Sequence, residues 1–255
     1  MTTEMEDYLF DLNGYIVLKG VLDSEHVATL NEGTDDLVKI ERGGSRGKVY
    51  HDAEKYEGIG IIIRNAVEGG EPFERLIDHP AWMAQIQRFL GSTEKPVLEQ
   101  SQLMVRGPGA ATRLHSGAHK RRMYTQFRYH NGEFRCGEIN ILMALTDIGP
   151  GDGATMVIPG SHKSNMIHPA FTSGASEPGA SLETVEGAIE VHMKAGDALL
   201  FVDCMAHGSA KRTNPGERRI LIYRYGPKWE SFYPSKAMHN RLTPEQRKLL
   251  NPSDE

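Results

Sequence analysis

The second half of the chain is divided into short runs of apolar residues, which are separated by turns rich in glycine and proline. Runs of about four to eight residues with this composition are typical of β-strands. We therefore expect strands at residues 98–106, 138–145, 155–158, 189–193, 198–202 and 219–225. Closely spaced strands with turn signals between them favour a sandwich or jelly roll. The predicted fold class is mainly β with peripheral helices.

The first part of the chain carries helical patterns instead. Asp23 and Ser24 supply an N-cap for a helix whose buried side includes Val27 and Leu30. Residues 80–90 have apolar positions at helical spacing and are followed by a glycine, which is a common stop signal. Two helices are therefore expected ahead of the strands.

Three further segments complete the pattern. Residues 14–18 predict a short strand, and residues 41–60, with several glycines and charges, predict a loop. Residues 170–187 are rich in Gly, Ser and Glu, and we expect a flexible insertion there. The sequence Thr243-Pro244-Glu245-Gln246 is a capping box with proline at the first helical position, so residues 243–250 should form a short helix.

A chain of 255 residues can bury one sizeable core. We expect one domain over residues 1–255, with an N-terminal helical region at about 1–95 and a barrel core at about 96–228. The net charge of −5 argues against binding to a nucleic-acid polymer, because such proteins usually carry a basic excess.

Cysteine content and hydropathy narrow the cellular setting. The two cysteines, Cys136 and Cys204, are too few for a secreted disulfide framework and are expected to be reduced thiols. Residues 1–10 are acidic and do not resemble a secretory signal. No apolar run approaches the roughly 20 residues that span a membrane. We expect a soluble cytoplasmic protein.

Several short motifs follow one another in an order that carries chemical information. They are His115-Ser116-Gly117, Ala144-Leu145-Thr146-Asp147, Pro159-Gly160-Ser161-His162, Gly196-Asp197-Ala198, His207-Gly208-Ser209 and Arg218-Arg219. Each motif alone is weak. In this order, with Arg218 eleven residues after His207, the chain resembles the phytanoyl-CoA dioxygenase-like branch of the iron(II)/2-oxoglutarate oxygenases. The resemblance runs from about Gly14 to about Tyr225 and implies a double-stranded β-helix that is cupin-like.

The resemblance implies an iron site that uses O2 and 2-oxoglutarate. Such sites hold iron(II) with two histidines and one carboxylate, and His115 and His207 match the histidines. Gly117 stands where the family has its carboxylate. In the halogenases of this superfamily a small residue occurs at that position and chloride binds the iron, so Gly117 suggests an open halide position.

Other interpretations of the missing carboxylate stay open. The alignment could be shifted, although no Asp or Glu stands two residues after His51, His119 or His130. The chain could be an inactive relative, or it could recruit a carboxylate from elsewhere. His119, four residues after His115, could instead pair with it in a zinc-like site.

The resemblance also implies a co-substrate site. Arg218 and Ser209 match the contacts to the distal carboxylate of 2-oxoglutarate, for which a guanidinium and a hydroxyl are suitable donors. Arg106, before a Gly-Pro-Gly turn, is a further candidate, and Asn140 and Gln102 are weaker ones. Arg219 should point away from Arg218 if both lie in a strand.

A basic and aromatic segment follows the first histidine. It contains Lys120, Arg121, Arg122 and Arg128 together with three aromatic residues. Such a segment close to a metal suits an anionic substrate with a flat ring, because guanidinium groups bind phosphate and aromatic faces stack on bases. A free nucleotide is one such partner, and the family includes chlorinases of 2′-deoxyadenosine monophosphate. A solvated basic loop is the alternative.

Together these features predict an iron(II)/2-oxoglutarate-dependent halogenase that chlorinates an unactivated C–H bond of a small anionic molecule, for which a nucleotide is the first candidate. One alternative is a hydroxylase of the same fold with a non-standard ligand set. Another is a non-catalytic small-molecule binding protein. The spacing of His207, Ser209 and Arg218 counts against the latter, since a binding module does not need to keep it.

Overall fold

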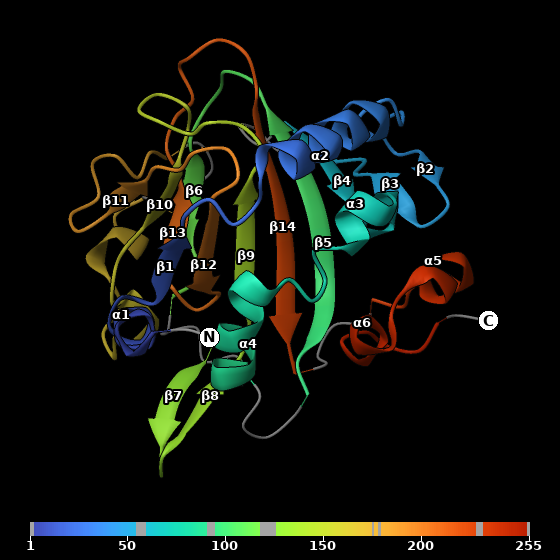
Figure 1. The fold of residues 1–255 in the computed structure, drawn as a ribbon. Helices are drawn as coiled ribbons and strands as arrows, with labels where there is room; N and C mark the ends of the chain where they lie inside the picture. Colours follow the sequence, from blue (N-terminus) through green and yellow to red (C-terminus); the bar gives the residue numbers. More distant parts are fainter. Residues whose placement is uncertain are drawn as a thin grey trace.

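The computed structural model describes residues 3–54, 60–90, 95–117, 126–174, 176–177, 180–227 and 232–253. Two antiparallel sheets dominate these residues and form a double-stranded β-helix with helices outside it (Figure 1). The predicted fold class is therefore confirmed.

The larger sheet has eight strands in the order β1-β12-β9-β14-β5-β4-β3-β2. Strands that are neighbours in this sheet come from distant parts of the chain. For example, β14 pairs with β5 on one side and with β9 on the other. The strands are β1 (Tyr15–Leu18), β2 (Ser45–Arg46), β3 (Val49–His51), β4 (Ile61–Arg64), β5 (Val97–Arg106), β9 (Ile139–Ala144), β12 (Ala198–Val202) and β14 (Arg218–Gly226).

A smaller sheet has the order β11-β10-β13-β6, and a separate hairpin consists of β7 and β8. In Figure 1 the smaller sheet lies to the left of β9 and β14, while the hairpin projects below it. These strands are β6 (Thr112–His115), β7 (Phe127–His130), β8 (Glu133–Cys136), β10 (Thr155–Val157), β11 (Ile189–Val191) and β13 (His207–Ser209).

Helices cover the outer face of the larger sheet and tie down its ends. The α-helices are α1 (Glu4–Asn13), α2 (Ser24–Leu37), α3 (Glu71–Glu74), α4 (Pro80–Leu90), α5 (Lys236–Arg241) and α6 (Pro244–Lys248). Short 3-10 turns occur at η1 (Ala66–Gly69), η2 (Ser161–Lys163) and η3 (Pro169–Phe171). Their caps follow the sequence: Asp23 accepts from the His26 amide at the start of α2, and Thr243 and Gln246 form the expected capping box.

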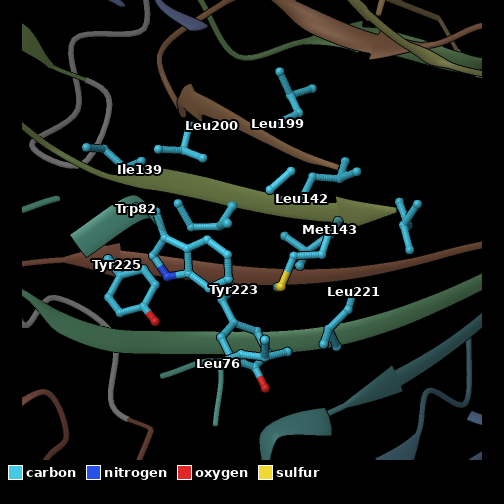
Figure 2. Packing of buried hydrophobic residues seen from close by; sticks show 14 of the residues in the cluster. Leu76, Trp82, Ile139, Leu142, Met143, Leu199, Leu200, Leu221, Tyr223 and Tyr225 are labelled. Carbon is cyan, nitrogen blue, oxygen red and sulfur yellow. The ribbon is translucent and has the colours of Figure 1, made fainter. Parts of the chain in front are cut away.

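Strand β14 shows how the layers are held together. Its residues alternate, so one set faces the smaller sheet while Leu221, Tyr223 and Tyr225 face the helices. The buried hydroxyls of these tyrosines donate at 2.7 Å to the carbonyls of Phe73 and Ile77. Trp82 of α4 belongs to the same buried cluster (Figure 2). Both faces of β14 are therefore buried, which explains the apolar run from Ile220 to Tyr223 at its centre.

Several predicted elements are confirmed within a residue or two, and others were wrong. The expected strands correspond to β1, β5, β9, β10, β11, β12 and β14, and the expected helices to α2, α4 and α6. The predicted loop at residues 41–60 instead contains the short strands β2 and β3, which extend the sheet beyond β4. These strands are short and partly exposed, so their sequences lack the apolar run that predicts a strand. The helix α1 was also missed, although Thr3 and Glu6 form a capping box at its start.

Candidate metal and co-substrate site

A cavity of about 280 Å³ lies between the two sheets. Alternate residues of β14, β5, β4 and β9 form one wall, and β6, β10 and β13 form the other. Its lining residues include Arg64, Gln102, Met104, Arg106, Thr112, His115, Asn140, Leu142, Phe201, His207, Ser209, Arg218, Ile220, Ile222 and Arg224.

Two histidines stand side by side in the smaller sheet. His115 ends β6 and His207 begins β13, and the two residues are Cα partners in the ladder. Their ring centroids are 4.1 Å apart. Each ring is oriented by its own strand, because His115 Nδ1 lies 2.9 Å from the Arg113 carbonyl and His207 Nδ1 lies 2.7 Å from the Met205 carbonyl.

These backbone contacts fix the chemistry of both rings. A carbonyl oxygen only accepts, so each Nδ1 carries the proton and donates it. The lone pair of each neutral imidazole then lies on Nε2, which is the arrangement that metal-binding histidines commonly have. Two neighbouring imidazoles with this tautomer fit a divalent transition metal such as iron(II).

The segment after His115 has an unusual backbone. Ser116 has a φ of 61° and Gly117 a φ of 104°, so two successive residues lie in the left-handed region. A side chain at a φ near 104° would be strained. Gly117 therefore has a conformational reason to be glycine, in addition to any role as an open metal position.

A third protein ligand is not evident near this pair. Within the described residues no group of three or more His, Cys, Asp or Glu side chains could hold a metal. His51 is buried in β3, where its Nδ1 contacts the Ile40 carbonyl at 2.8 Å, and His130 belongs to the separate β7–β8 hairpin. His119, the candidate for a zinc-like pair, lies outside the described residues.

The predicted co-substrate residues meet at one end of the cavity. Strand register pairs Arg218 of β14 with Arg106 of β5, although 112 positions separate them in the chain. Arg106 donates to Ser209 Oγ at 2.8 Å and to the Ala210 carbonyl at 3.1 Å. Thr112 Oγ1 lies 2.8 Å from the same serine oxygen. Arg218 donates to the Gly153 carbonyl.

Two buried positive charges at this end have no carboxylate partner in the part of the chain that the structure describes. Burial lowers the pKa of Arg218 to about 9, and the charges of Arg106 and Arg212 add to this effect. Burial likewise lowers the pKa of Arg106 to about 10, with Arg212 contributing. Arg212 has an ion pair with Asp152 at 2.8 Å, whereas among the described residues no carboxylate pairs with Arg106 or Arg218.

An anion would compensate these charges. The Nε atoms of Arg106 and Arg218 are buried and lack a hydrogen-bond partner in the described structure. A buried guanidinium charge without a counter-ion is costly, and a carboxylate is the ligand that matches its geometry. The pair therefore fits one carboxylate of a dicarboxylic acid such as 2-oxoglutarate.

Asn140 lies elsewhere in the cavity. It is 1% exposed, and the β9–β14 register places it opposite Arg224. Arg224 is six positions from Arg218 along β14, which corresponds to roughly 20 Å at about 3.3 Å per residue. Arg64 and Arg224, which also line the cavity, were not expected from the sequence. The alternation of Arg218, Ile220, Ile222 and Arg224 was the signal that could have identified Arg224.

The predicted substrate-binding residues are not brought to this cavity by the described structure. Lys120, Arg121 and Arg122 lie outside the described residues. Arg128 is exposed on β7 and does not line the cavity. The reason is that β7 pairs with β8 in a separate hairpin, so this arginine faces solvent. Arg128 thus offers no support for a nucleotide site.

Fold and site together define the class of the protein. A double-stranded β-helix encloses two neighbouring imidazoles and a buried arginine pair, which is an arrangement suited to a metal ion and a dicarboxylate. Residues 10–220 match the family model "Phytanoyl-CoA dioxygenase (PhyH)". The chain belongs to this family.

Relatives of known name agree with this membership. The chain is 33% identical over 246 residues to the iron/alpha-ketoglutarate-dependent dioxygenase penM of Penicillium thymicola, covering 93% of this chain and 74% of penM. It is 26% identical over 230 residues to the dioxygenase cdmD of Talaromyces verruculosus, covering 84% of this chain and 68% of cdmD. The chain is accordingly an iron(II)- and 2-oxoglutarate-dependent oxidoreductase.

The fold has a close counterpart among solved structures. HygX from Streptomyces hygroscopicus, with nickel and 2-oxoglutarate bound, superposes with a TM-score of 0.77 at 20% identity, covering 99% of this chain and 96% of HygX. This likeness establishes the fold. In the described part of the chain, helices of the length and apolarity needed to cross a membrane do not occur.

Proposed function

We propose that this protein oxidises a C–H bond of a small molecule, with iron(II) held by His115 and His207 and 2-oxoglutarate held by the buried arginine pair. The observation that carries the proposal is the pairing of two Nε2 lone pairs in one sheet with two uncompensated guanidinium groups on the facing wall of the same cavity. When bound, iron(II) with 2-oxoglutarate and O2 supplies the oxidant.

The chain's own residues set the binding and orientation of the reactants. Arg218, together with Arg106, supplies charge-assisted donors for the distal carboxylate, and the Ser209 hydroxyl lies beside them. Leu142, Ile220 and Ile222 provide an apolar part of the wall. An apolar wall excludes water and holds a carbon skeleton close to the metal, where positioning decides which C–H bond reacts.

Oxygenation is the outcome that the relatives favour. Both penM and cdmD carry the name dioxygenase, and one HygX structure contains hygromycin B beside nickel and 2-oxoglutarate. A small molecule is therefore the substrate class we propose. Because Gly117 has no ligating side chain, the third position would be filled by water or by an acid from another part of the chain.

Halogenation is a second candidate, and Gly117 is the observation that favours it. Loss of the carboxylate at this position leaves one positive charge of the metal uncompensated, which a chloride ion could neutralise. The left-handed backbone at Gly117 is an independent reason for glycine, so this residue supports a halide position without requiring one. Chloride, and a nucleotide as the substrate, belong to this second candidate.

One experiment tests the proposal and separates its two outcomes. The purified protein is loaded anaerobically with iron(II) and 2-oxoglutarate, the visible charge-transfer band is recorded, and chloride is titrated. A band that does not respond to chloride supports oxygenation. A saturable shift supports a halide position. The proposal would be overturned if the wild-type protein showed no charge-transfer band even at a high concentration of 2-oxoglutarate.

A further inference from the structure

The cavity has a second polar end, which lies apart from the Arg106–Arg218 pair. Arg64, Gln102, Asn140 and Arg224 all line the cavity, and we call these four residues the arc. They come from four neighbouring strands, β4, β5, β14 and β9, with β14 between β5 and β9. The register sets Arg64 opposite Gln102 and Arg224 opposite Asn140.

Hydrogen bonds hold two side chains of the arc in place, whereas the other two side chains have buried atoms without a hydrogen-bond partner in the described part of the chain. Arg64 donates to Gln102 Oε1 at 2.7 Å and to Asp52 at 3.1 Å, so both side chains are held in place. Arg224 forms an ion pair with Glu138 at 3.6 Å, a distance that is too long for a hydrogen bond. For buried Arg224 Nε and Asn140 Oδ1, no hydrogen-bond partner occurs among the described residues.

A ligand whose oxygen atoms accept hydrogen bonds from the arginines would satisfy the unpartnered atoms of the arc. Buried polar atoms are normally satisfied, and an unsatisfied guanidinium nitrogen beside an unsatisfied amide oxygen is costly to maintain without a partner. The cavity wall carries four arginines and, within the described chain, no Asp or Glu. Arg64 forms an ion pair with Asp52 at 3.0 Å and Arg224 one with Glu138 at 3.6 Å, so the unpartnered buried atoms of the arc, rather than an uncompensated charge, mark it as a ligand site.

The two ends differ in access. The side chains of Arg64 and Arg224 are 28% and 29% exposed, whereas Arg106 and Arg218 are buried. Arg64 also lines a neighbouring cavity of about 470 Å³. The arc is therefore the more open end, as expected where a substrate enters and where its outermost group is recognised.

We propose that the arc binds an oxyanion of the primary substrate, a carboxylate or a phosphate, and so selects anionic small molecules. This inference rests on the proposed function, because it takes the Arg218 end to be filled by 2-oxoglutarate. The oxyanion would accept from Arg224 and Arg64, and a protonated or hydroxyl group next to it would donate to Asn140 Oδ1. The apolar wall between the two ends would contact the carbon skeleton.

The test uses protein loaded with nickel(II) and 2-oxoglutarate, so that the Arg218 end is occupied. Hexanoate, 1-hexanol and hexylamine share one carbon chain length and differ in charge, and inorganic phosphate serves as a second oxyanion. Binding is measured by isothermal titration calorimetry. We expect hexanoate or phosphate to bind at least tenfold more tightly than 1-hexanol, and the stronger of the two indicates the source of the oxyanion.

Variants then locate the binding. Arg224→Gln and Arg64→Gln should each weaken oxyanion binding at least tenfold and leave the dissociation constant of 2-oxoglutarate within twofold. Arg224→Lys keeps the charge and should retain part of the affinity. Arg219→Gln, on the opposite face of β14, is the matched control and should change neither constant. Thermal unfolding of each variant checks that it is folded.

Several outcomes would overturn the inference. These are oxyanions that bind no more tightly than 1-hexanol, or binding that persists in Arg224→Gln and Arg64→Gln, or a parallel loss of 2-oxoglutarate in the same variants. If the wild-type protein fails to bind nickel and 2-oxoglutarate, the proposed function fails instead. Hexanoate titration of the Arg218→Gln variant, in which the other arginine site is weakened, then tests the arc separately.

Discussion

Arg218 and Arg219 are neighbours in β14, yet their guanidinium groups lie on opposite faces of the larger sheet. Arg218 is buried in the cavity, whereas Arg219 forms ion pairs with Asp35 at 2.7 Å and Glu217 at 3.0 Å outside it. Successive residues of a strand point to opposite faces, which accounts for the separation. The pair therefore provides a site residue and its own control.

Replacing Arg218 should weaken the binding of 2-oxoglutarate and leave the metal site unchanged. Arg218→Gln removes a charge-assisted contact to a buried carboxylate, which is worth about 2 kcal/mol, or roughly a 30-fold higher dissociation constant for 2-oxoglutarate. Calorimetric titration of the nickel-loaded protein measures the constant. Arg219→Gln should leave it unchanged. Wild-type affinity in Arg218→Gln would remove this residue from the site.

Replacing Arg218 should stabilise the ligand-free protein, although it weakens the binding of 2-oxoglutarate. Because the Arg218 charge is buried without a carboxylate partner among the described residues, Arg218→Met should raise the free energy of unfolding of the ligand-free protein by about 1 kcal/mol or more. Urea denaturation with and without 2-oxoglutarate measures this. A destabilised ligand-free variant would show that the charge is better compensated than its surroundings indicate.

The two histidines should act as one metal site. His115→Ala and His207→Ala should each weaken nickel binding by at least about 100-fold, because each removes a direct ligand. Equilibrium dialysis with metal analysis measures the constants. His192→Ala, at an exposed residue paired with Glu190, is the control. Retention of tight nickel binding in either site variant would place the metal elsewhere.

Gly117 should be difficult to replace, whatever completes the coordination of the metal. Its φ of 104° disfavours any L side chain, so Gly117→Ala should lower the free energy of unfolding by about 1–2 kcal/mol. Gly149→Ala, where a Cβ would meet only ordinary contacts, is the matched control.

Gly117→Asp addresses the occupant of the position. If a chloride-dependent shift of the charge-transfer band exists in the wild type, the added carboxylate should abolish it. An unchanged shift in Gly117→Asp would separate the halide from this position.

His162 should make the stability of the protein depend on pH. Burial lowers its pKa to about 4, and its Nε2 donates to the Asp11 carbonyl at 2.9 Å. In the unfolded chain the pKa returns to its ordinary value of 6.5. The unfolded chain therefore binds the proton more readily, so the contribution is complete above pH 6.5 and is lost as the pH falls toward 4.

The change in unfolding free energy gives the test. Between pH 7.5 and pH 4.5 the His162 contribution should fall by about 2 kcal/mol. Urea denaturation at both values measures it. His162→Gln keeps a donor for the Asp11 carbonyl and removes the titratable group. Over the same pH range the unfolding free energy of this variant should therefore fall by about 2 kcal/mol less than that of the wild type. Equal losses in the two proteins would contradict the assignment.

Much of the fold follows from local patterns. The runs that became β9 and β12 are mostly apolar because both of their faces are buried, and helix α2 begins at the cap that Asp23 provides. Short and polar elements could not be recognised in this way. The pairing of β3 with β4 and of β2 with β3, rather than residue preference, stabilises these two strands, and pairing partners are not visible in a local window.

The candidate site divides in the same way. The sequence by itself determined the chemistry available, through the order of His115, His207 and Arg218 and the glycine at position 117. Strand periodicity also fixed that Arg218 and Arg219 would face opposite ways.

Only the tertiary structure decided which distant side chains meet. The register of β14 with β5 and β9 sets Arg106 beside Arg218 and Asn140 beside Arg224, and the pairing of β7 with β8 directs Arg128 away from the cavity. The physical reason is that both faces of the central strands β9 and β14 are almost entirely buried. Burial alone therefore does not show which residue of a neighbouring strand lies opposite each side chain, because strand register is set by packing across the whole barrel.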